Sequence, residues 1–395
     1  MNILFHTYGK IEPTKGGTER TTITTAAGLT HLYGCRCYSV YEEQSSSSKV
    51  ECFVDEVYWQ IVRDEDANVD FLRSVLLRFH IDFVIIQGAF IHVKRFRRAV
   101  EGLDCKIILA HHFEPGGEQV FFKFKDVLFV HTKSLKGLVR KLYQTIFYPF
   151  LRRQHLTRLA CSYREAYENA DSVILLSEKY IPPYQAFGGF SDDAKFSIIP
   201  NALSFDEILP KSEIENKEKT VLIVSRLDER FKKISLALQI WNRVKLSPIS
   251  KDWKLEIIGH GKDERLYKDL VAKNKISDVY FLGRQNPISY YKKTSIFLMT
   301  SSSESWGLTL TEAQQMGCVP MAFDTYPTLR DIITDGEDGF VIEKDDIDAY
   351  VLKLLELISD GNKRNQMARR GLENCQRFSQ EKIVKEWWNL LNNLM

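Results

Sequence analysis

The chain has 395 residues, and a length of this size predicts two to three domains. Its composition, with 44% hydrophobic, 12% aromatic and 27% charged residues, is that of a globular protein and excludes a disordered, collagen-like or disulfide-stapled chain. Lysine and arginine number 54 against 52 acidic residues, a formal charge of +2. The chain as a whole therefore lacks the basic excess of a dedicated nucleic-acid binder, and we expect no nucleic-acid partner.

The N-terminal sequence MNILFHTYGK has neither the basic start nor the small-residue cleavage site of a signal peptide. No apolar run approaches the ~18 residues that a membrane-spanning helix needs. The seven cysteines are scattered, which is typical of free thiols in a reducing compartment. These features predict a cytoplasmic protein.

Short β-rich runs alternate with longer helical patterns along the chain, as in folds built from parallel sheets. In the first half, strands are expected at residues 2–6, 36–40, 83–87, 106–110, 172–176 and 196–199. In the second half, they are expected at 221–225, 254–258, 279–282, 296–300, 319–323 and 340–342. The alternation predicts an α/β chain with two doubly wound, Rossmann-like parallel-sheet domains.

The boundary between the two halves is expected near the polar stretch KSEIENKEK at residues 211–219, which has the composition of a linker. We expect an N-terminal domain over residues 1–203 and a C-terminal domain over residues 204–376. Residues 377–395 are expected to form a Trp-rich amphipathic helix that crosses back to the first domain.

Two stretches of the first half have ligand-binding character. Gly16 and Gly17 precede a helical pattern, where paired glycines allow close backbone approach to a ligand, although an ordinary turn has the same composition. His111 and His112 follow the strand at 106–110, a position where ligands bind in open α/β sheets; a hydrogen-bonded loop histidine is the alternative. Adjacent residues point in different directions, so we expect no metal at this pair.

The second half places charged side chains after two predicted strands. Arg226, Lys232 and Lys233 follow the strand at 221–225, where they can neutralise a diphosphate or remain solvated surface charges. Glu304 lies in a polar loop and Glu312 in the helix that begins near residue 306 or 307. The amides of that helix start can bind an anion, and the two carboxylates suit sugar hydroxyls.

Several motifs, in this order along nearly the whole chain, resemble the retaining glycosyltransferases of family four, of the GT-B type. They comprise Gly16-Gly17-Thr18-Glu19-Arg20, Ala170-Asp171 to Leu176-Ser177, Ile199-Pro200-Asn201, Ser225-Arg226-Leu227, Gly259-His260-Gly261, Glu304 to Glu312 as E-x7-E, and Gly317-Cys318-Val319-Pro320. The resemblance implies two Rossmann-like domains that face each other across a cleft.

The resemblance also implies roles for individual residues toward a nucleotide-sugar donor. Arg226 and Lys232 would hold the diphosphate, Glu304 would contact the donor sugar and Glu312 the ribose. The backbone of Ser305, Trp306, Gly307 and Leu308 would contact the sugar and the phosphate, and Gly16 and Gly17 would contact the phosphate. His112 would lie near the reaction centre, and Gly283 and Arg284 would lie near the base. The spacing from Arg226 leaves Lys233 as an alternative to Lys232, and the doubled histidine leaves His111 as an alternative to His112.

The implied activity is the metal-independent, retaining transfer of a hexose-type sugar from a nucleotide-diphosphate donor, preferably a UDP-sugar. The implied acceptor is a glycan or a lipid-linked molecule. The implied process is surface polysaccharide biosynthesis, such as that of lipopolysaccharide or capsule. The nucleotide sugar is a substrate, and no cofactor is expected. A nucleotide-sugar epimerase, a sugar phosphorylase and a non-catalytic nucleotide-sugar-binding protein are alternatives.

Residues 120–160 form a basic, aromatic segment, although the formal charge of the whole chain is only +2. This segment has nine lysines and arginines against one acid, Asp126, a difference of +8, with aromatic residues between them. Basic residues interleaved with aromatics are typical of an interfacial membrane surface, and a solvated helix pair with core aromatics is the alternative. We expect this segment to dock peripherally on the inner face of an anionic membrane.

Overall fold

The computed structural model describes residues 1–12, 16–44, 49–88, 90–121 and 134–395. Residues 13–15 of the loop before Gly16 and residues 122–133 of the basic segment lie outside the described residues. The chain divides into two compact units, one of Met1–Pro200 with Val384–Met395 and one of Asn201–Ile383.

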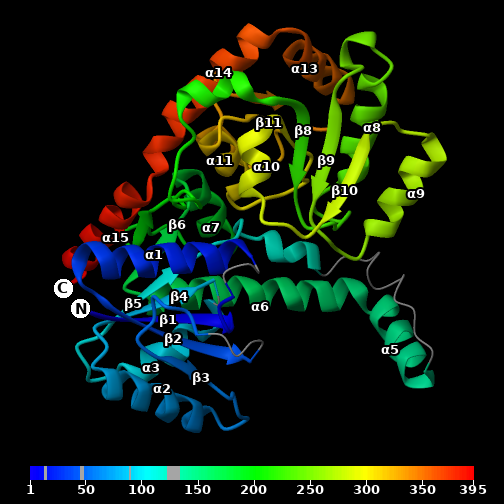
Figure 1. Cartoon of the computed structure of the whole chain (residues 1–395). Helices are drawn as coiled ribbons and strands as arrows, with labels where there is room; N and C mark the ends of the chain where they lie inside the picture. The colour runs from blue at the N-terminus through cyan, green and yellow to red at the C-terminus, as the bar shows by residue number, and fades with distance from the viewer. Residues whose placement is uncertain (13–15, 45–48, 89, 122–133) are drawn as a thin grey trace. The chain divides into compact units, whose positions relative to one another are not determined.

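The first unit is built on a seven-stranded parallel sheet with strand order β3-β2-β1-β4-β5-β6-β7 (Figure 1). Its strands are β1 (Asn2–Gly9), β2 (Arg36–Glu43), β3 (Glu56–Tyr58), β4 (Phe83–Gln87), β5 (Lys106–Ala110), β6 (Ser172–Leu175) and β7 (Phe196–Ile198). The sequence prediction missed β3, a three-residue edge strand that pairs only with β2. An edge strand this short has no apolar run for a pattern to detect.

The helices of the first unit cover both faces of its sheet, because the chain moves outward from β1 to β3 and then returns to β4. α2 (Glu65–Phe79), α3 (Val93–Ala99), α6 (Tyr148–Asn169) and α7 (Ile181–Gly188) pack in succession. α1 (Gly17–Tyr33) joins β1 to β2, and α5 (Leu135–Ile146) precedes α6.

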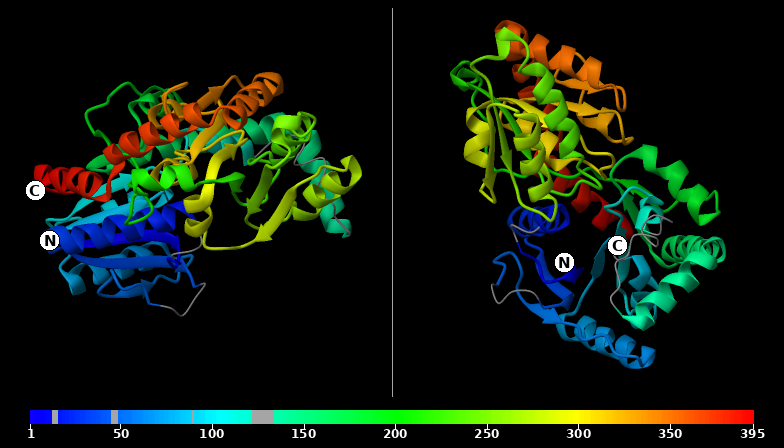
Figure 2. Two further views of the ribbon diagram at one scale, coloured as in Figure 1. Left: turned by 45° about the horizontal axis from the view of Figure 1, so that its top comes forward. Right: turned by 90° about the vertical axis from the view of Figure 1, so that its right-hand side faces the viewer.

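The C-terminal helix α15 (Gln380–Leu394) lies beside α1 in both Figure 1 and Figure 2. Trp388 stacks on Tyr33 with ring centroids 4.5 Å apart. A Cβ atom on Gly28 would lie only 2.4 Å from Val384 Cγ2, so the absence of a side chain at Gly28 allows the close approach. The expected amphipathic face is buried here through Trp387 and Leu391.

The second unit is built on a six-stranded parallel sheet with strand order β10-β9-β8-β11-β12-β13. Its strands are β8 (Glu218–Val224), β9 (Lys254–Ile258), β10 (Val279–Gly283), β11 (Thr294–Met299), β12 (Val319–Phe323) and β13 (Phe340–Ile342). Its helices are α8 (Ile234–Val244), α9 (Glu264–Asn274), α10 (Ile288–Lys293), α11 (Leu308–Gln315), α12 (Leu329–Ile332), α13 (Ile347–Ser359) and α14 (Gly361–Asn374). Two Rossmann-like parallel sheets confirm the predicted fold class.

The prediction of a linker at residues 211–219 is wrong. The stretch forms a 3-10 helix, η4 (Lys211–Asn216), and the start of β8, both inside the second unit. Ile214 is buried, and Lys217 Nζ donates a hydrogen bond to the carbonyl oxygen of Tyr291 at 2.8 Å. The polar composition of residues 211–219 gave no indication that Ile214 and Lys217 anchor this stretch within the second unit.

None of the helices in the described part of the chain is both long enough and apolar enough to cross a membrane.

Candidate functional site

The loop after β8 presents Arg226 at the carboxyl end of the second sheet. Its side chain is 65% exposed, while the next residue, Leu227, is buried and anchors the loop. The Leu227 amide donates to the carbonyl oxygen of His260 at 3.0 Å, and the Ser225 amide donates to that of Ile258 at 2.9 Å. The loop backbone is therefore held against the neighbouring strand end while the guanidinium reaches solvent.

Gly259 and Gly261 make this backbone contact possible. A Cβ atom on Gly259, whose φ is +140°, would lie 1.8 Å from the carbonyl oxygen of Ser225. A Cβ atom on Gly261 would lie 2.3 Å from the carbonyl oxygen of Leu227. Only glycine fits at either position, so these two residues set the position of Arg226 although neither has a side chain.

Lys232 and Glu304 form an ion pair that joins the loop after β8 to the loop after β11. Their side chains are 21% and 16% exposed, so the pair is partly shielded from water. Ser301 Oγ also donates to Glu304 Oε1 at 2.7 Å. Thr300 Oγ1 donates to the carbonyl oxygens of Lys232 and Lys233 at 3.1 and 3.0 Å, which fixes the same loop from its backbone.

The two lysines differ in backbone conformation. Lys233 has a φ of +50° and directly precedes the first residue of α8. The side-chain ammonium of Lys232 contacts the Glu304 carboxylate. The structure thus brings Lys232, and not Lys233, into contact with a second predicted site residue. Which of them holds a diphosphate stays a prediction.

The start of α11 provides backbone amides beside this pair. Gly307 precedes the helix with a φ of +93°, and a Cβ atom there would lie 2.6 Å from Tyr326 Oη. The Trp306 side chain is buried and packs edge-on against Phe378 at 5.2 Å. Trp306 is therefore a core side chain, and only its backbone, with that of Ser305 and Leu308, can serve a ligand.

Glu312 lies within α11 and is fully buried. Its Oε2 accepts a hydrogen bond from Tyr291 Oη at 3.1 Å. The structure therefore keeps this carboxylate away from solvent, and its predicted contact with a ribose stays a prediction. Gly283, at the end of β10, has a φ of +68° and open space beside it, and Arg284 follows as an exposed residue.

The first unit holds the remaining predicted residues. Gly16 caps α1 in an extended conformation, and Gly17 is the first residue of the helix. His111 and His112 follow β5 and face different surroundings. His111 is enclosed by aromatic rings, including Tyr163 and Tyr184 with centroids 5.3 and 5.2 Å away.

His112 is buried and hydrogen-bonds through Nε2 to Gln87 Oε1, at the end of β4. Because a carbonyl oxygen only accepts, the His112 proton lies on Nε2 and Nδ1 is the acceptor. Burial lowers the pKa of His112 to about 4 and that of His111 to about 3, so both rings are neutral near pH 7. His111 is part of an aromatic core, and which of the two histidines serves a ligand stays a prediction.

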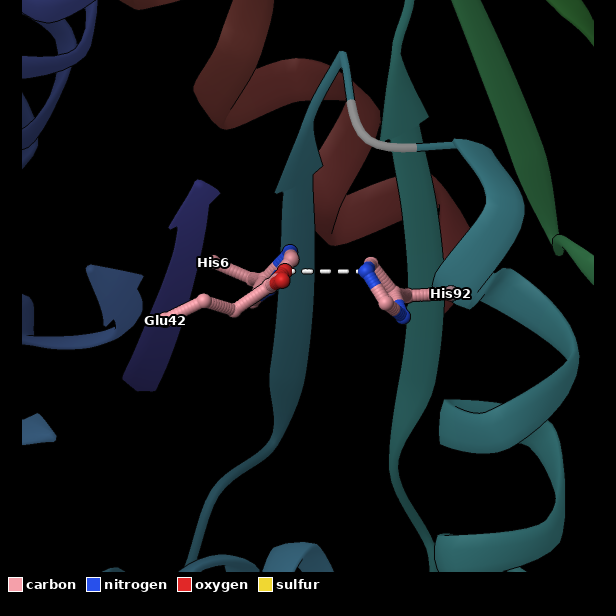
Figure 3. A group of neighbouring side chains, drawn as sticks. All are labelled: His6, Glu42 and His92. Atoms are coloured by element: carbon pink, nitrogen blue, oxygen red, sulfur yellow. Dashed lines mark hydrogen bonds and ion pairs between the residues drawn. The ribbon is translucent and has the colours of Figure 1, made fainter. Parts of the chain in front are cut away.

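A further cluster, which the sequence prediction missed, joins His6 of β1, Glu42 of β2 and His92 after β4 (Figure 3). Their side chains are nearly buried, and Glu42 Oε1 lies 3.0 Å from His6 Nε2 and 2.9 Å from His92 Nε2. Burial acts to raise the pKa of Glu42, but the hydrogen bonds from the two histidines lower it to about 2. No spacing in the sequence marks these residues, because they come from β1, β2 and the 3-10 helix η1 (Phe90–His92).

Two histidines and a carboxylate are a possible set of metal ligands. However, Arg95 Nη1 donates to His92 Nδ1 at 2.8 Å, so the His92 proton lies on Nε2 and is donated to Glu42. A histidine ligand needs the opposite arrangement, with Nε2 unprotonated. The geometry therefore fits a hydrogen-bonded network better than a metal site.

Comparison with known proteins identifies proteins that are similar to this chain. Residues 204–374 match the family described as Glycosyl transferases group 1. An uncharacterized glycosyltransferase of Haemophilus influenzae is 32% identical over 187 residues, which cover 47% of this chain and 52% of that protein. A second relative is a Campylobacter jejuni alpha-1,4-N-acetyl-D-galactosaminyltransferase, named for a glycan linked to PP-undecaprenol. It is 29% identical over 189 residues, which cover 47% of this chain and 51% of that enzyme. This chain therefore spans about half the length of these two relatives.

Among solved structures, Anabaena HepE in complex with UDP and glucose superposes over 100% of both chains with a TM-score of 0.73. Its sequence identity is 15%, so this likeness concerns the fold. The fold of the whole chain is that of the GT-B glycosyltransferases.

Proposed function

We propose, from the match of residues 204–374 to the glycosyl transferases group 1 family, that this chain is a retaining glycosyltransferase. It would transfer a hexose-type sugar from a nucleotide diphosphate, preferably UDP, to a glycan or lipid-linked acceptor in surface polysaccharide biosynthesis. The observation that carries this proposal is the ion pair of Lys232 with Glu304, which joins the loop after β8, where Arg226 also lies, to the loop that leads into α11.

In this proposal, the second unit binds the donor. Arg226 presents an exposed guanidinium that pairs with phosphate oxygens in bidentate fashion. Lys232 contributes a second positive charge, which a bound diphosphate would share with Glu304. The amides at the start of α11 donate to the phosphate or the sugar, and these donors stabilise the negative charge that develops on the departing diphosphate.

Glu304 would accept hydrogen bonds from hydroxyls of the donor sugar. Its carboxylate already accepts from Ser301 and pairs with Lys232, which lowers its reactivity as a nucleophile. We therefore assign it to sugar binding. The acceptor oxygen bonds to the anomeric carbon as the bond to the leaving phosphate oxygen breaks, and the acceptor proton passes to that phosphate. His112 would contact the donor sugar through its unprotonated Nδ1, and no metal ion or cofactor is required.

The relatives support the substrate classes. The Campylobacter jejuni relative is named for a glycan linked to diphospho-undecaprenol, and HepE was solved with UDP and glucose. These properties belong to those proteins, and we extend only their chemical classes, a nucleotide sugar and a lipid-linked glycan, to this chain.

A thermal-shift panel of UDP-, GDP- and ADP-sugars tests donor binding, because a ligand that binds only the folded state raises its stability. We expect a UDP-sugar to give the largest shift. Incubation with a lipid-linked oligosaccharide should then yield an elongated product with an unchanged anomeric configuration, and activity should survive EDTA. Free epimerised sugar or sugar phosphate formed without an acceptor would identify the epimerase or phosphorylase alternatives. Binding without any turnover would identify a non-catalytic protein.

A further inference from the structure

The helix α5 and the start of α6 carry a cluster of exposed hydrophobic side chains, here called the α5 face. Its seven members, each 47–63% exposed, are Leu138, Val139, Leu142, Tyr143, Ile146, Phe147 and Phe150. Within α5 the members follow the spacing i, i+1, i+4, i+5 and i+8, which places them on one side of a helix. Apolar area of this size in water is unfavourable, so the α5 face is expected to have an occupant.

The α5 face projects from the first unit. Figures 1 and 2 show α5 at the far end of the long helix α6, which is its packing partner within the unit. Ser134 caps α5 by accepting a hydrogen bond from the Gly137 amide at 3.1 Å. The helix α5 therefore begins at its own N-cap residue, and its apolar side faces solvent.

Positive charge surrounds the α5 face. Residues 134–160 contain six basic and no acidic residues, the basic ones being Lys136, Arg140, Lys141, Arg152, Arg153 and Arg158. On a helical projection of α5, Lys136 and Arg140 border one edge of the apolar side and Lys141 lies toward the other. A helix with an apolar side bordered by lysine and arginine is the form that lies in a membrane interface.

We propose that the α5 face docks this chain on an anionic membrane surface. The apolar side chains enter the boundary between headgroups and acyl chains, and the bordering cations contact lipid phosphates. A second copy of the chain is a poorer occupant, because it would bring six more positive charges against the first six. Nucleic acid offers phosphates but no apolar layer for Leu138, Leu142 and Ile146.

Co-sedimentation of the full chain with vesicles tests the proposal. We expect binding to phosphatidylcholine vesicles that contain phosphatidylglycerol, weaker binding at high salt, and little binding to phosphatidylcholine alone. Arg140→Gln and Arg152→Gln should each weaken partitioning about fivefold, as expected for one surface cation. Leu142→Asp with Ile146→Asp should abolish binding. These measurements need no sugar donor, so their failure is separate from failure of the proposed activity.

Matched controls lie on the second unit. Arg265→Gln removes a cation that is 94% exposed, and Leu246→Asp changes an apolar side chain that is 81% exposed. Neither should alter vesicle binding. No binding to anionic vesicles at low salt would overturn the proposal. Equal losses in the control variants would also overturn it, as would a dimer that Leu142→Asp with Ile146→Asp converts to monomer without changing vesicle binding.

Discussion

The ammonium of Lys232 and the carboxylate of Glu304, 72 residues apart in sequence, form one ion pair across the ends of β8 and β11. The loops that hold the pair follow β8 and β11, which are neighbours in the second sheet. The sequence predicts a diphosphate contact for Lys232 and a sugar contact for Glu304, and the structure places the two side chains in direct contact.

Replacement of Lys232 should therefore impair turnover more than replacement of Lys233. For Lys232→Ala we expect kcat to fall about 10²–10³-fold, as for removal of one group that stabilises developing charge. Steady-state kinetics with a UDP-sugar measure the effect, and Lys233→Ala is the matched control. A larger loss in Lys233→Ala would show that the other lysine serves the diphosphate.

The same pair should show energetic coupling. In a double-mutant cycle of Lys232→Met and Glu304→Gln, residues in direct contact are expected to couple by about 0.5–3 kcal/mol. The free energies of unfolding of the four variants, measured by urea denaturation without donor, provide the four corners of the cycle. Strict additivity would mean that the ion pair does not persist in solution.

Arg226→Ala should weaken donor binding without destabilising the fold, because the side chain is 65% exposed. A hydrogen bond to a charged group is worth roughly 1.5–3 kcal/mol, which corresponds to a loss of about ten- to a hundredfold in donor affinity. Arg265→Ala, a change of the same type at a position that is 94% exposed, should leave donor affinity unchanged. An unchanged affinity in Arg226→Ala would exclude the arginine from the donor site.

Gly259→Ala should destabilise the second unit, because the added Cβ would lie 1.8 Å from the carbonyl oxygen of Ser225. We expect a loss of about 3 kcal/mol in the free energy of unfolding, at the upper end of backbone strain energies, and weaker donor binding through displaced Arg226. Gly336→Ala is a control with a φ of +75° and no neighbour within 4 Å, for which a loss of about 1–2 kcal/mol is expected from the left-handed conformation alone. Equal effects in urea unfolding would contradict the backbone contact.

The two histidines after β5 should make stability depend on pH. Burial lowers the pKa of His111 to about 3, below its unfolded value of 6.5, so the unfolded chain binds the proton first as pH falls. Stability is therefore lost progressively between about pH 6.5 and pH 3. In His111→Phe, which keeps a ring among Tyr163 and Tyr184, the melting temperature should fall less steeply with acid. An unchanged slope in His111→Phe would contradict this prediction.

Much of the fold followed from local patterns. Residues 83–87, 106–110, 254–258, 319–323 and 340–342 form β4, β5, β9, β12 and β13 with the predicted bounds. Apolar residues make up most of each of these strands, the pattern of parallel strands that are buried on both faces. The edge strand β3 and the 3-10 helix η4 lacked such a pattern and were missed or misassigned.

The sequence by itself determined the strand–helix alternation, the two parallel sheets and the order of the family-like motifs. Only the tertiary structure decided that Lys232 reaches Glu304, that His111 enters an aromatic core, that Glu312 is buried against Tyr291, and that His6, Glu42 and His92 meet. The reason is physical. Periodicity and turn chemistry act over a few neighbouring residues, whereas these contacts depend on strand register and side-chain direction between segments 21 to 86 residues apart, from Tyr291–Glu312 to His6–His92.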